Sequence, residues 1–162
     1  MFAKSVLIDT NLLLLYLVGT FSEDAILKSQ RLKSYTIEDF RILKRFLEGS
    51  PKILITANIS TEISNLIDFN GESLKKFYAI FDVFLQLPQV EEIHLDSKLI
   101  SSRNEFSIYG LTDAGINSLA KKYLILTDDS RLYAYYCKNI CSSSDPNDEI
   151  INFYHILQAS WS

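Results

Sequence analysis

In the stretch SVLIDTN (residues 5–11), a short apolar run is followed directly by an acid and two small polar residues. An apolar run of this length that stops at an acid is typical of a buried parallel strand. The three polar residues are all potential helix caps, and the apolar residues Leu12–Val18 that follow them are expected to be helical up to Gly19. The stretch therefore predicts a strand, a polar turn and a helix.

The same pattern occurs twice more along the chain. Ile53–Thr56 is an apolar run that leads into helical spacing over Asn58–Asp68. Leu124–Thr127 ends in Asp128-Asp129, before a helix expected from Ser130 to about Tyr136. Strands that alternate with helices predict an α/β fold, with a central parallel sheet and helices on both faces. In such sheets, ligands bind outside the carboxyl ends of the strands.

Further helical patterns lie between these strands, because apolar residues recur there at helical spacing. Residues 90–95 fit either a short strand or a connection, residues 142–146 fit a loop, and residues 150–157 have no clear type. The expected helices are one with Ile37, Phe40, Leu43 and Leu47 on its apolar face, one over Leu74–Leu85 ended by Pro88, one from Ser97 to about Tyr109, and one from Thr112 or Asp113 to Lys122.

Composition restricts the class of protein. The chain has 162 residues, of which 48% are hydrophobic, with only 5 Gly and 3 Pro, so we expect one packed domain over residues 1–162. The net charge of −4 argues against a protein that coats nucleic acid generally, so any nucleic acid must be held by local basic patches. Cys137 and Cys141, with His94 and His155, are too few and too scattered for a disulfide framework or a zinc site. The apolar run at residues 12–18 is too short to span a membrane, and we expect a soluble cytoplasmic protein.

Acidic residues recur where a strand is expected to end or a helix to begin. Carboxylates gathered at one sheet edge repel one another, and a divalent cation would neutralise them. Without His or Cys nearby, oxygen ligands favour Mg²⁺ or Mn²⁺. Each acid also has an ordinary alternative, as a helix cap or as a solvated side chain. The acids concerned are Asp9, Glu62, Asp113, Asp128 and Asp129.

Four segments in order resemble the acidic motifs of the PIN-domain nucleases, and the likeness is closest to the VapC-type toxin ribonucleases. The resemblance extends from Val6 to about Asn139. It implies a three-layer α/β/α sandwich, one or two Mg²⁺ or Mn²⁺ ions, endoribonuclease activity on RNA, an antitoxin partner protein and a homodimer. The segments are Ile8-Asp9-Thr10-Asn11, Thr61-Glu62-Ile63-Ser64-Asn65, Leu111-Thr112-Asp113-Ala114 and Leu126-Thr127-Asp128-Asp129.

The same resemblance implies roles for individual residues. Asp9, Glu62 and Asp113 correspond to metal-binding catalytic acids, and Asp129 corresponds to the fourth, with Asp128 as the rival. Polar residues of the motifs, which would support these acids, are Thr10, Asn11, Asn65 and Thr127. The implied reaction is hydrolysis of a phosphodiester by a metal-activated water.

Two basic clusters are candidates for contact with RNA phosphates, although each could equally be a solvated helix face. Arg41, Lys44 and Arg45 lie in the segment Thr20–Ser50, which is longer than in the compact toxins. The second cluster lies close in sequence to the third and fourth acidic motifs and consists of Lys121, Lys122 and Arg131.

Other classes of function fit less well. A catalytically silent PIN-like module that binds RNA or a protein partner is the main alternative, although such a module should have lost at least one of the four acids. A response-regulator receiver needs paired acids at the end of the first strand, and a haloacid-dehalogenase phosphatase needs Asp-x-Asp there. Asp9-Thr10-Asn11 meets neither requirement.

Overall fold

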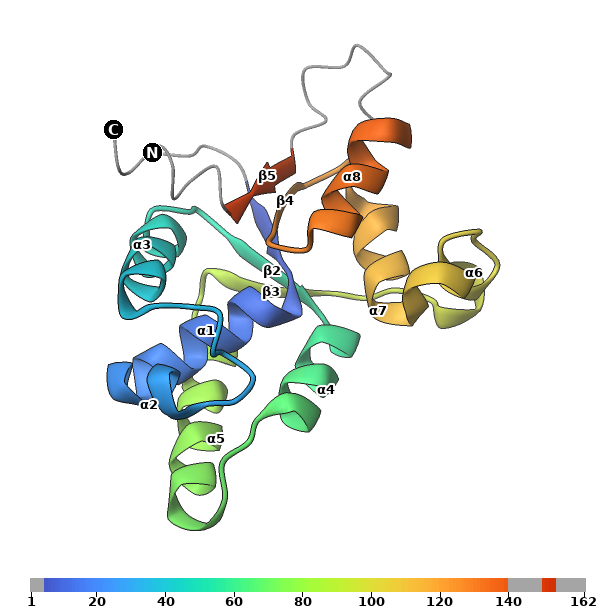
Figure 1. Cartoon of the computed structure of the whole chain (residues 1–162). Coiled ribbons are helices and arrows are strands. Elements are labelled where there is room, and N and C mark those ends of the chain that lie inside the picture. Colours follow the sequence, from blue (N-terminus) through green and yellow to red (C-terminus); the bar gives the residue numbers. More distant parts are fainter. Residues whose placement is uncertain (1–4, 140–149, 154–162) are drawn as a thin grey trace, which may run out of the picture.

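The computed structural model describes residues 5–139 and 150–153, which form a five-stranded parallel sheet flanked by helices (Figure 1). The order of the strands is β3-β2-β1-β4-β5, and every neighbouring pair is parallel. The predicted α/β class is confirmed, and the arrangement is compatible with a three-layer sandwich. The strands are β1 (Val6–Ile8), β2 (Ile53–Thr56), β3 (Val90–Ile93), β4 (Leu124–Thr127) and β5 (Ile150–Asn152).

The helices pack on both sides of this sheet. Figure 1 shows α1, α2 and α3 on the left of the sheet and α6, α7 and α8 on its right. In the described residues, no helix is long and apolar enough to cross a membrane. The helices are α1 (Thr10–Phe21), α2 (Glu23–Lys28), α3 (Ile37–Glu48), α4 (Ala57–Leu66), α5 (Gly71–Leu85), α6 (Ser97–Ser101), α7 (Phe106–Leu119) and α8 (Ser130–Asn139).

Burial explains why three strands could be predicted and β3 could not. All residues of β1, β2 and β4 are buried, as expected for strands covered on both faces. In β3, Val90 and Ile93 are partly buried while Glu91 and Glu92 are exposed. β3 lies at the edge of the sheet, where charged side chains are common, and its short polar sequence lacks the apolar run of a central strand.

The prediction that Gly19 ends the first helix is wrong. α1 continues to Phe21, and Ser22 caps it by donating its N–H to the carbonyl of Val18. Gly19 instead lets α3 approach α1 closely. A Cβ added at Gly19 would lie 2.2 Å from Cδ2 of Phe40, whose ring is buried. The glycine therefore marks a helix contact and not a helix end.

The helix predicted over residues 97–109 is also interrupted. α6 ends at Ser101 and α7 begins at Phe106. Within α7, Gly110 has φ 82° and ψ −178°, a conformation that glycine adopts far more readily than other residues. Gly110 thus breaks α7 just before Thr112 and Asp113, and the helix ends at Leu119, before the predicted Lys122.

Several expectations concern residues beyond the described part of the chain. These are the loop at residues 142–146, Cys141, His155 and residues 154–157. Residues 150–152, whose type the sequence left open, form β5 and pair with β4.

Candidate functional site

The direction in which the chain adds strands to the sheet reverses between β1 and β4. From β1 the chain adds β2 and then β3 on one side, after which β4 and β5 are added on the other side. Ligands of open α/β sheets bind at the carboxyl ends of the strands at such a switch point. Asp9 directly follows β1, and Asp128-Asp129 directly follows β4, so acids stand at both strand ends that form this crevice.

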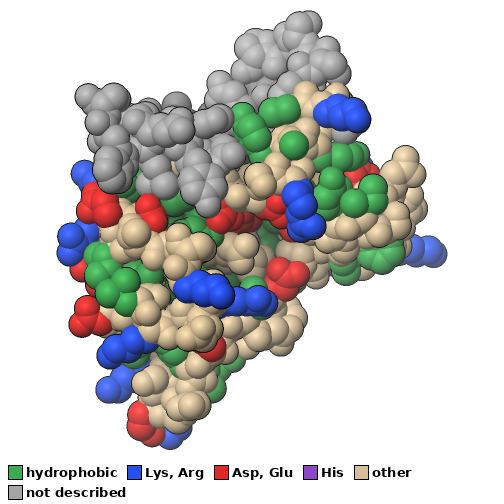
Figure 2. Space-filling view, in the orientation of Figure 1, with side chains coloured by type: hydrophobic (Ala, Val, Ile, Leu, Met, Phe, Trp, Pro, Cys, Tyr) green, Lys and Arg blue, Asp and Glu red, His purple; other side chains and the backbone are tan. Residues whose placement is uncertain are grey.

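A pocket of about 140 Å³ lies at this point and brings together the four acids of the predicted motifs. In Figure 2, acidic side chains surround a hollow near the centre of the face shown. Acidic residues from the end of β1, from α4, from α7 and from the β4–α8 turn thus line one pocket. Besides Asp9, Glu62, Asp113 and Asp129, the lining consists of Thr10, Asn11, Leu66, Thr127 and Leu132.

Asp9 is the most buried and most tethered of the four acids, with 6% of its surface exposed. Its Oδ1 accepts the N–H of Leu12 at 2.9 Å and caps α1. Its Oδ2 accepts the hydroxyl of Thr127 and, at 3.1 Å, the N–H of Asp128. Burial, together with the charge of Asp128, raises the pKa of Asp9 from 3.8 to about 8. Asp9 is therefore both a helix cap and a member of the acidic pocket.

Two threonine hydroxyls orient Glu62. Thr10, the first residue of α1, donates to Oε2 at 2.8 Å, and Thr112 of α7 donates to Oε1 at 2.5 Å. Thr10 therefore supports Glu62, whereas Thr127 supports Asp9. The role of Thr112 was not anticipated, since its sequence context suggested only a helix cap.

Asp113 is the least constrained of the four acids. It has no hydrogen-bond partner within the described residues, whereas the other three carboxylates each accept at least two hydrogen bonds. Burial raises the pKa of Asp113 from 3.8 to about 6; the charges of Asp129 and Glu62 add to this rise, and that of Arg131 opposes it.

The side chains of the neighbouring residues Asp128 and Asp129 point in different directions. Asp129 lines the pocket, and its Oδ1 accepts the N–H groups of Arg131 at 2.8 Å and Leu132 at 3.2 Å, which caps α8. Asp128 points instead to the hydroxyl of Tyr35, which donates to its Oδ2. Burial raises the pKa of Asp128, and its Oδ1 is buried without a partner in the described structure. Of the two acids, only Asp129 faces the pocket.

The remaining polar candidates differ in whether they line the pocket. Asn11 is exposed and lines the pocket. Asn65 is also exposed but does not line it; Leu66, the next residue of α4, does so instead. Because 3.6 residues make one helical turn, Leu66 lies on nearly the same face of α4 as Glu62.

The predicted basic cluster on α3 is paired with acids. Arg41 contacts Glu23 at 2.7 Å, Lys44 lies 3.9 Å from Glu48, and Arg45 lies 3.6 Å from Glu38. These six residues line a hollow of their own, apart from the acidic pocket. Their charges are balanced locally, which weakens the case for a phosphate-binding track at α3.

The second basic cluster is divided by β4. Lys121 and Lys122 are exposed and precede β4, whereas the pocket lies at the carboxyl end of that strand. A strand of four residues separates the two ends by roughly 13 Å. Arg131 is on the pocket side, where its guanidinium lies 3.6 Å from Oδ2 of Asp129.

No protein-family model, curated protein or solved structure matches the chain. A functional assignment therefore depends on the chemistry of the site. The pocket has four carboxylates from separate segments, and threonine hydroxyls hold two of them, Asp9 and Glu62. One guanidinium, that of Arg131, lies beside the pocket.

The donor chemistry of the pocket fits a hard divalent cation, since Mg²⁺ and Mn²⁺ prefer carboxylate oxygens. The raised pKa values of Asp9 and Asp113 come from burial and mutual repulsion, both of which a cation would offset. In the part of the chain that the structure describes, no three His, Cys, Asp or Glu side chains converge closely enough to hold an ion. Ligation by three carboxylates thus requires at least one to move inward, and Asp113 is the least tethered.

Proposed function

We propose that this chain is a PIN-type metal-dependent endoribonuclease that hydrolyses phosphodiester bonds of RNA. The observation that carries the proposal is the pocket at the switch point of the sheet, which unites Asp9, Glu62, Asp113 and Asp129. The acids come from four separate segments in the order of the PIN motifs. Isolated helix caps would not be expected to share one pocket.

The four carboxylates would hold one or two Mg²⁺ or Mn²⁺ ions. Such ions supply an activated water and stabilise the leaving oxygen of a phosphodiester. The protein's own part is to preorganise the ligands: Thr127 fixes Asp9, Thr10 and Thr112 fix Glu62, and backbone N–H groups fix Asp129. Ligands held in this way lose little conformational entropy when a cation binds.

The proposal predicts RNA cleavage that depends on metal. Purified protein should cleave single-stranded RNA with Mn²⁺ or Mg²⁺ and should lose this activity with a chelator. Asp96→Asn is a matched control, because Asp96 is an exposed acid that caps α6 and lies outside the pocket. It should cleave like the wild type. Cleavage by clean protein without metal would contradict the proposal.

A second prediction distinguishes the two neighbouring acids. Asp129→Asn should raise the Kd for Mn²⁺ by at least about tenfold, whereas Asp128→Asn should change it little. Asparagine also caps helices well, so the start of α8 should be preserved in Asp129→Asn. Calorimetric titration of Mn²⁺ into both variants measures the difference. The reverse order would place Asp128 at the metal.

A catalytically silent PIN-like module is the second candidate, favoured by the separation of the carboxylates in the described structure. Such a module would bind RNA or a protein equally well with Mn²⁺ and with a chelator, and would never cleave. An antitoxin partner and a homodimer belong to the proposal through the PIN resemblance alone, and a cytoplasmic location belongs to it through the composition and the short apolar run of the sequence.

A further inference from the structure

An aromatic pair lies on the seam between α7 and α8, two helices that each contribute a residue to the lining of the acidic pocket. The rings of Tyr109 and Tyr135 are 5.5 Å apart at an interplanar angle of 69°, an edge-to-face contact. Both side chains are partly exposed. In Figure 2, hydrophobic side chains gather over α7 and α8 beside the acidic hollow, with basic side chains among them.

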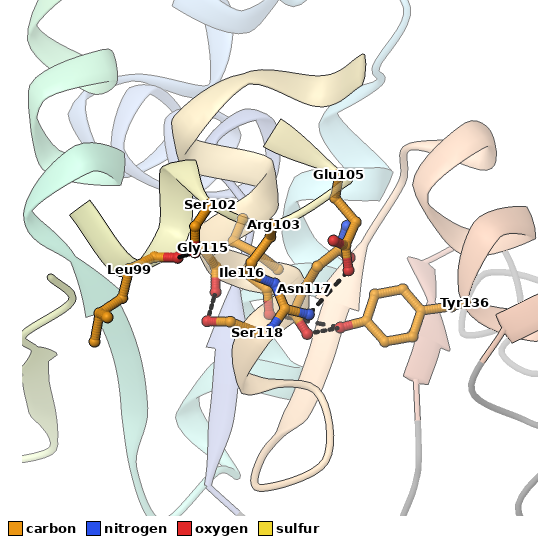
Figure 3. A network of polar contacts seen from close by, with 9 residues as sticks. All are labelled: Leu99, Ser102, Arg103, Glu105, Gly115, Ile116, Asn117, Ser118 and Tyr136. Atoms are coloured by element: carbon orange, nitrogen blue, oxygen red, sulfur yellow. Dashed lines mark hydrogen bonds and ion pairs between the residues drawn. The ribbon is translucent and has the colours of Figure 1, made fainter. Parts of the chain in front are cut away.

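The seam is held in place by polar contacts on its inner side. The buried Tyr136 donates its hydroxyl to the backbone carbonyl of Asn117 at 3.2 Å, which anchors α8 on α7 (Figure 3). Glu105 accepts a hydrogen bond from Arg103 at 2.9 Å and another from the hydroxyl of Tyr135. Tyr135 is therefore fixed at its hydroxyl end, and its ring is preorganised.

α8 presents cations on the same face as this ring. Arg131, Tyr135 and Lys138 are spaced four and three residues apart, which places them in one stripe along the helix. The side chain of Arg131 is 78% exposed, and Lys138 is also exposed. Arg131 contacts Asp129 of the pocket. Tyr135 lies four residues, or about 6 Å along the helix axis, beyond Arg131.

Tyr109 lies on α7, the helix that contributes Asp113 to the pocket. It lies four residues before Asp113, with the Gly110 break between them. The two tyrosines thus lie on the helices that carry a pocket acid, Asp113, and a pocket-side cation, Arg131. Arg103, whose side chain is 39% exposed, pairs with Glu105, which also accepts the hydroxyl of Tyr135.

We propose that Tyr109 and Tyr135 form a stacking subsite for a base of single-stranded nucleic acid, flanked by Arg131 and Lys138 as phosphate contacts. Single strands bind to aromatic rings within cationic grooves, because every base has a face that stacks and every linkage carries a negative charge. The alternation of cation, ring and cation on α8 matches that chemistry. The choice of ligand rests on the proposed nuclease function, whereas the subsite itself requires no metal.

The test compares a base-containing strand with a base-free strand in the presence of EDTA, so that no cleavage occurs. Fluorescence anisotropy measures binding of a labelled oligouridylate and of an abasic oligonucleotide of equal length. Tyr135→Ala should weaken binding of oligouridylate by about 5- to 150-fold and leave the abasic strand nearly unaffected. Tyr135→Phe, which keeps the ring, should retain most of the preference for bases.

Tyr78→Ala is the matched control, since Tyr78 is an exposed tyrosine on α5, far from α8 in sequence. It should bind both strands like the wild type. Arg131→Gln should weaken both strands alike and reduce the salt dependence, by about 0.7 in the slope of log K against log salt. Thermal melts establish that each variant is folded.

The possible outcomes separate the subsite from the nuclease proposal. Base-selective loss in Tyr135→Ala, in a protein that never cleaves RNA, would support the subsite and refute the nuclease. Metal-dependent cleavage with equal binding of both strands by wild type and Tyr135→Ala would refute the subsite alone. A wild-type dimer that dissociates in Tyr135→Ala, without any base preference, would make the patch a protein interface and overturn the inference.

Discussion

Asp9→Asn is expected to abolish Mn²⁺-dependent RNA cleavage and to remove most of the stabilisation that Mn²⁺ gives the folded protein. Asp9 stands at the end of β1, at the centre of the sheet, and lines the pocket with the three other acids. A ligand at a hundredfold excess over its Kd stabilises the folded state by about 2.7 kcal/mol. Asparagine keeps an oxygen for the N–H of Leu12 but carries no charge for a cation.

The same substitution should change how stability depends on pH without metal. Burial raises the pKa of Asp9 to about 8, against 3.8 as its ordinary value. Between these values the folded protein binds more protons than the unfolded chain, so the free energy of unfolding falls as pH rises, by about 1.4 kcal/mol per unit for one group. Asp9→Asn lacks this group, and its stability relative to wild type should therefore improve from pH 5 to pH 8.

Urea denaturation of both proteins at several pH values, with and without Mn²⁺, measures these effects. Asp96→Asn serves as the control, because Asp96 is an exposed cap and should follow the wild type at every pH. A difference between Asp9→Asn and wild type that stays constant with pH would mean that Asp9 does not titrate above its ordinary range. Equal Mn²⁺ shifts in the two proteins would remove Asp9 from the metal site.

Gly19→Ala is expected to destabilise the protein by about 1 to 3 kcal/mol, through overpacking between α1 and α3. A Cβ at Gly19 would lie within 2.5 Å of three ring atoms of Phe40. Phe40 is only 3% exposed, so its ring has little room to move away. Alanine favours a helix by about 1 kcal/mol over glycine, which offsets only part of this cost. The melting temperature should fall by about 2 to 4 °C per kcal/mol.

Gly49→Ala provides the matched control. Gly49 caps α3 with φ −83°, a conformation open to alanine, and the nearest atom to its added Cβ is a backbone oxygen at 3.4 Å. This substitution should be neutral or slightly stabilising. Combining Gly19→Ala with Phe40→Leu should cost less than the sum of the two single changes, because the smaller side chain relieves the clash. Strict additivity would mean that Phe40 is not what opposes a side chain at position 19.

Much of the sheet could be predicted from local sequence. β1, β2 and β4 are apolar runs buried on both faces, and such runs carry a signal that needs no partner to be recognised. Two helix bounds could not be predicted: the end of α1, which lies beyond Gly19, and the interruption between α6 and α7. From the sequence alone, Gly19 looks like the end of a helix. In the structure a glycine is needed there because the ring of Phe40, on another helix, leaves no room for a Cβ. The break at Gly110 lies between the helix predicted to end near Tyr109 and the helix predicted to begin at Thr112 or Asp113, as expected.

The candidate acids could also be predicted, because Asp9, Asp113 and Asp129 stand where a strand ends or a helical segment begins. Their partners could not be predicted. Glu62 receives hydroxyls from α1 and α7, and the hydrogen bond from Tyr35 to Asp128 joins residues 93 positions apart. A hydrogen bond between distant segments depends on the packing of whole elements, for which a single sequence carries no local mark.

The sequence by itself determined the alternation of strands and helices and the presence of acids at their junctions, since periodicity and capping act over a few residues. Only the tertiary structure decided that β4 lies beside β1, and this creates the switch point at which the acids meet. The tertiary structure also directs the side chain of Asp129 into the pocket and that of Asp128 toward Tyr35. It places the length of β4 between Lys121 and the pocket. The physical reason is the same in each case: strand order and side-chain direction follow from burying both faces of the sheet at once, which no segment can do alone.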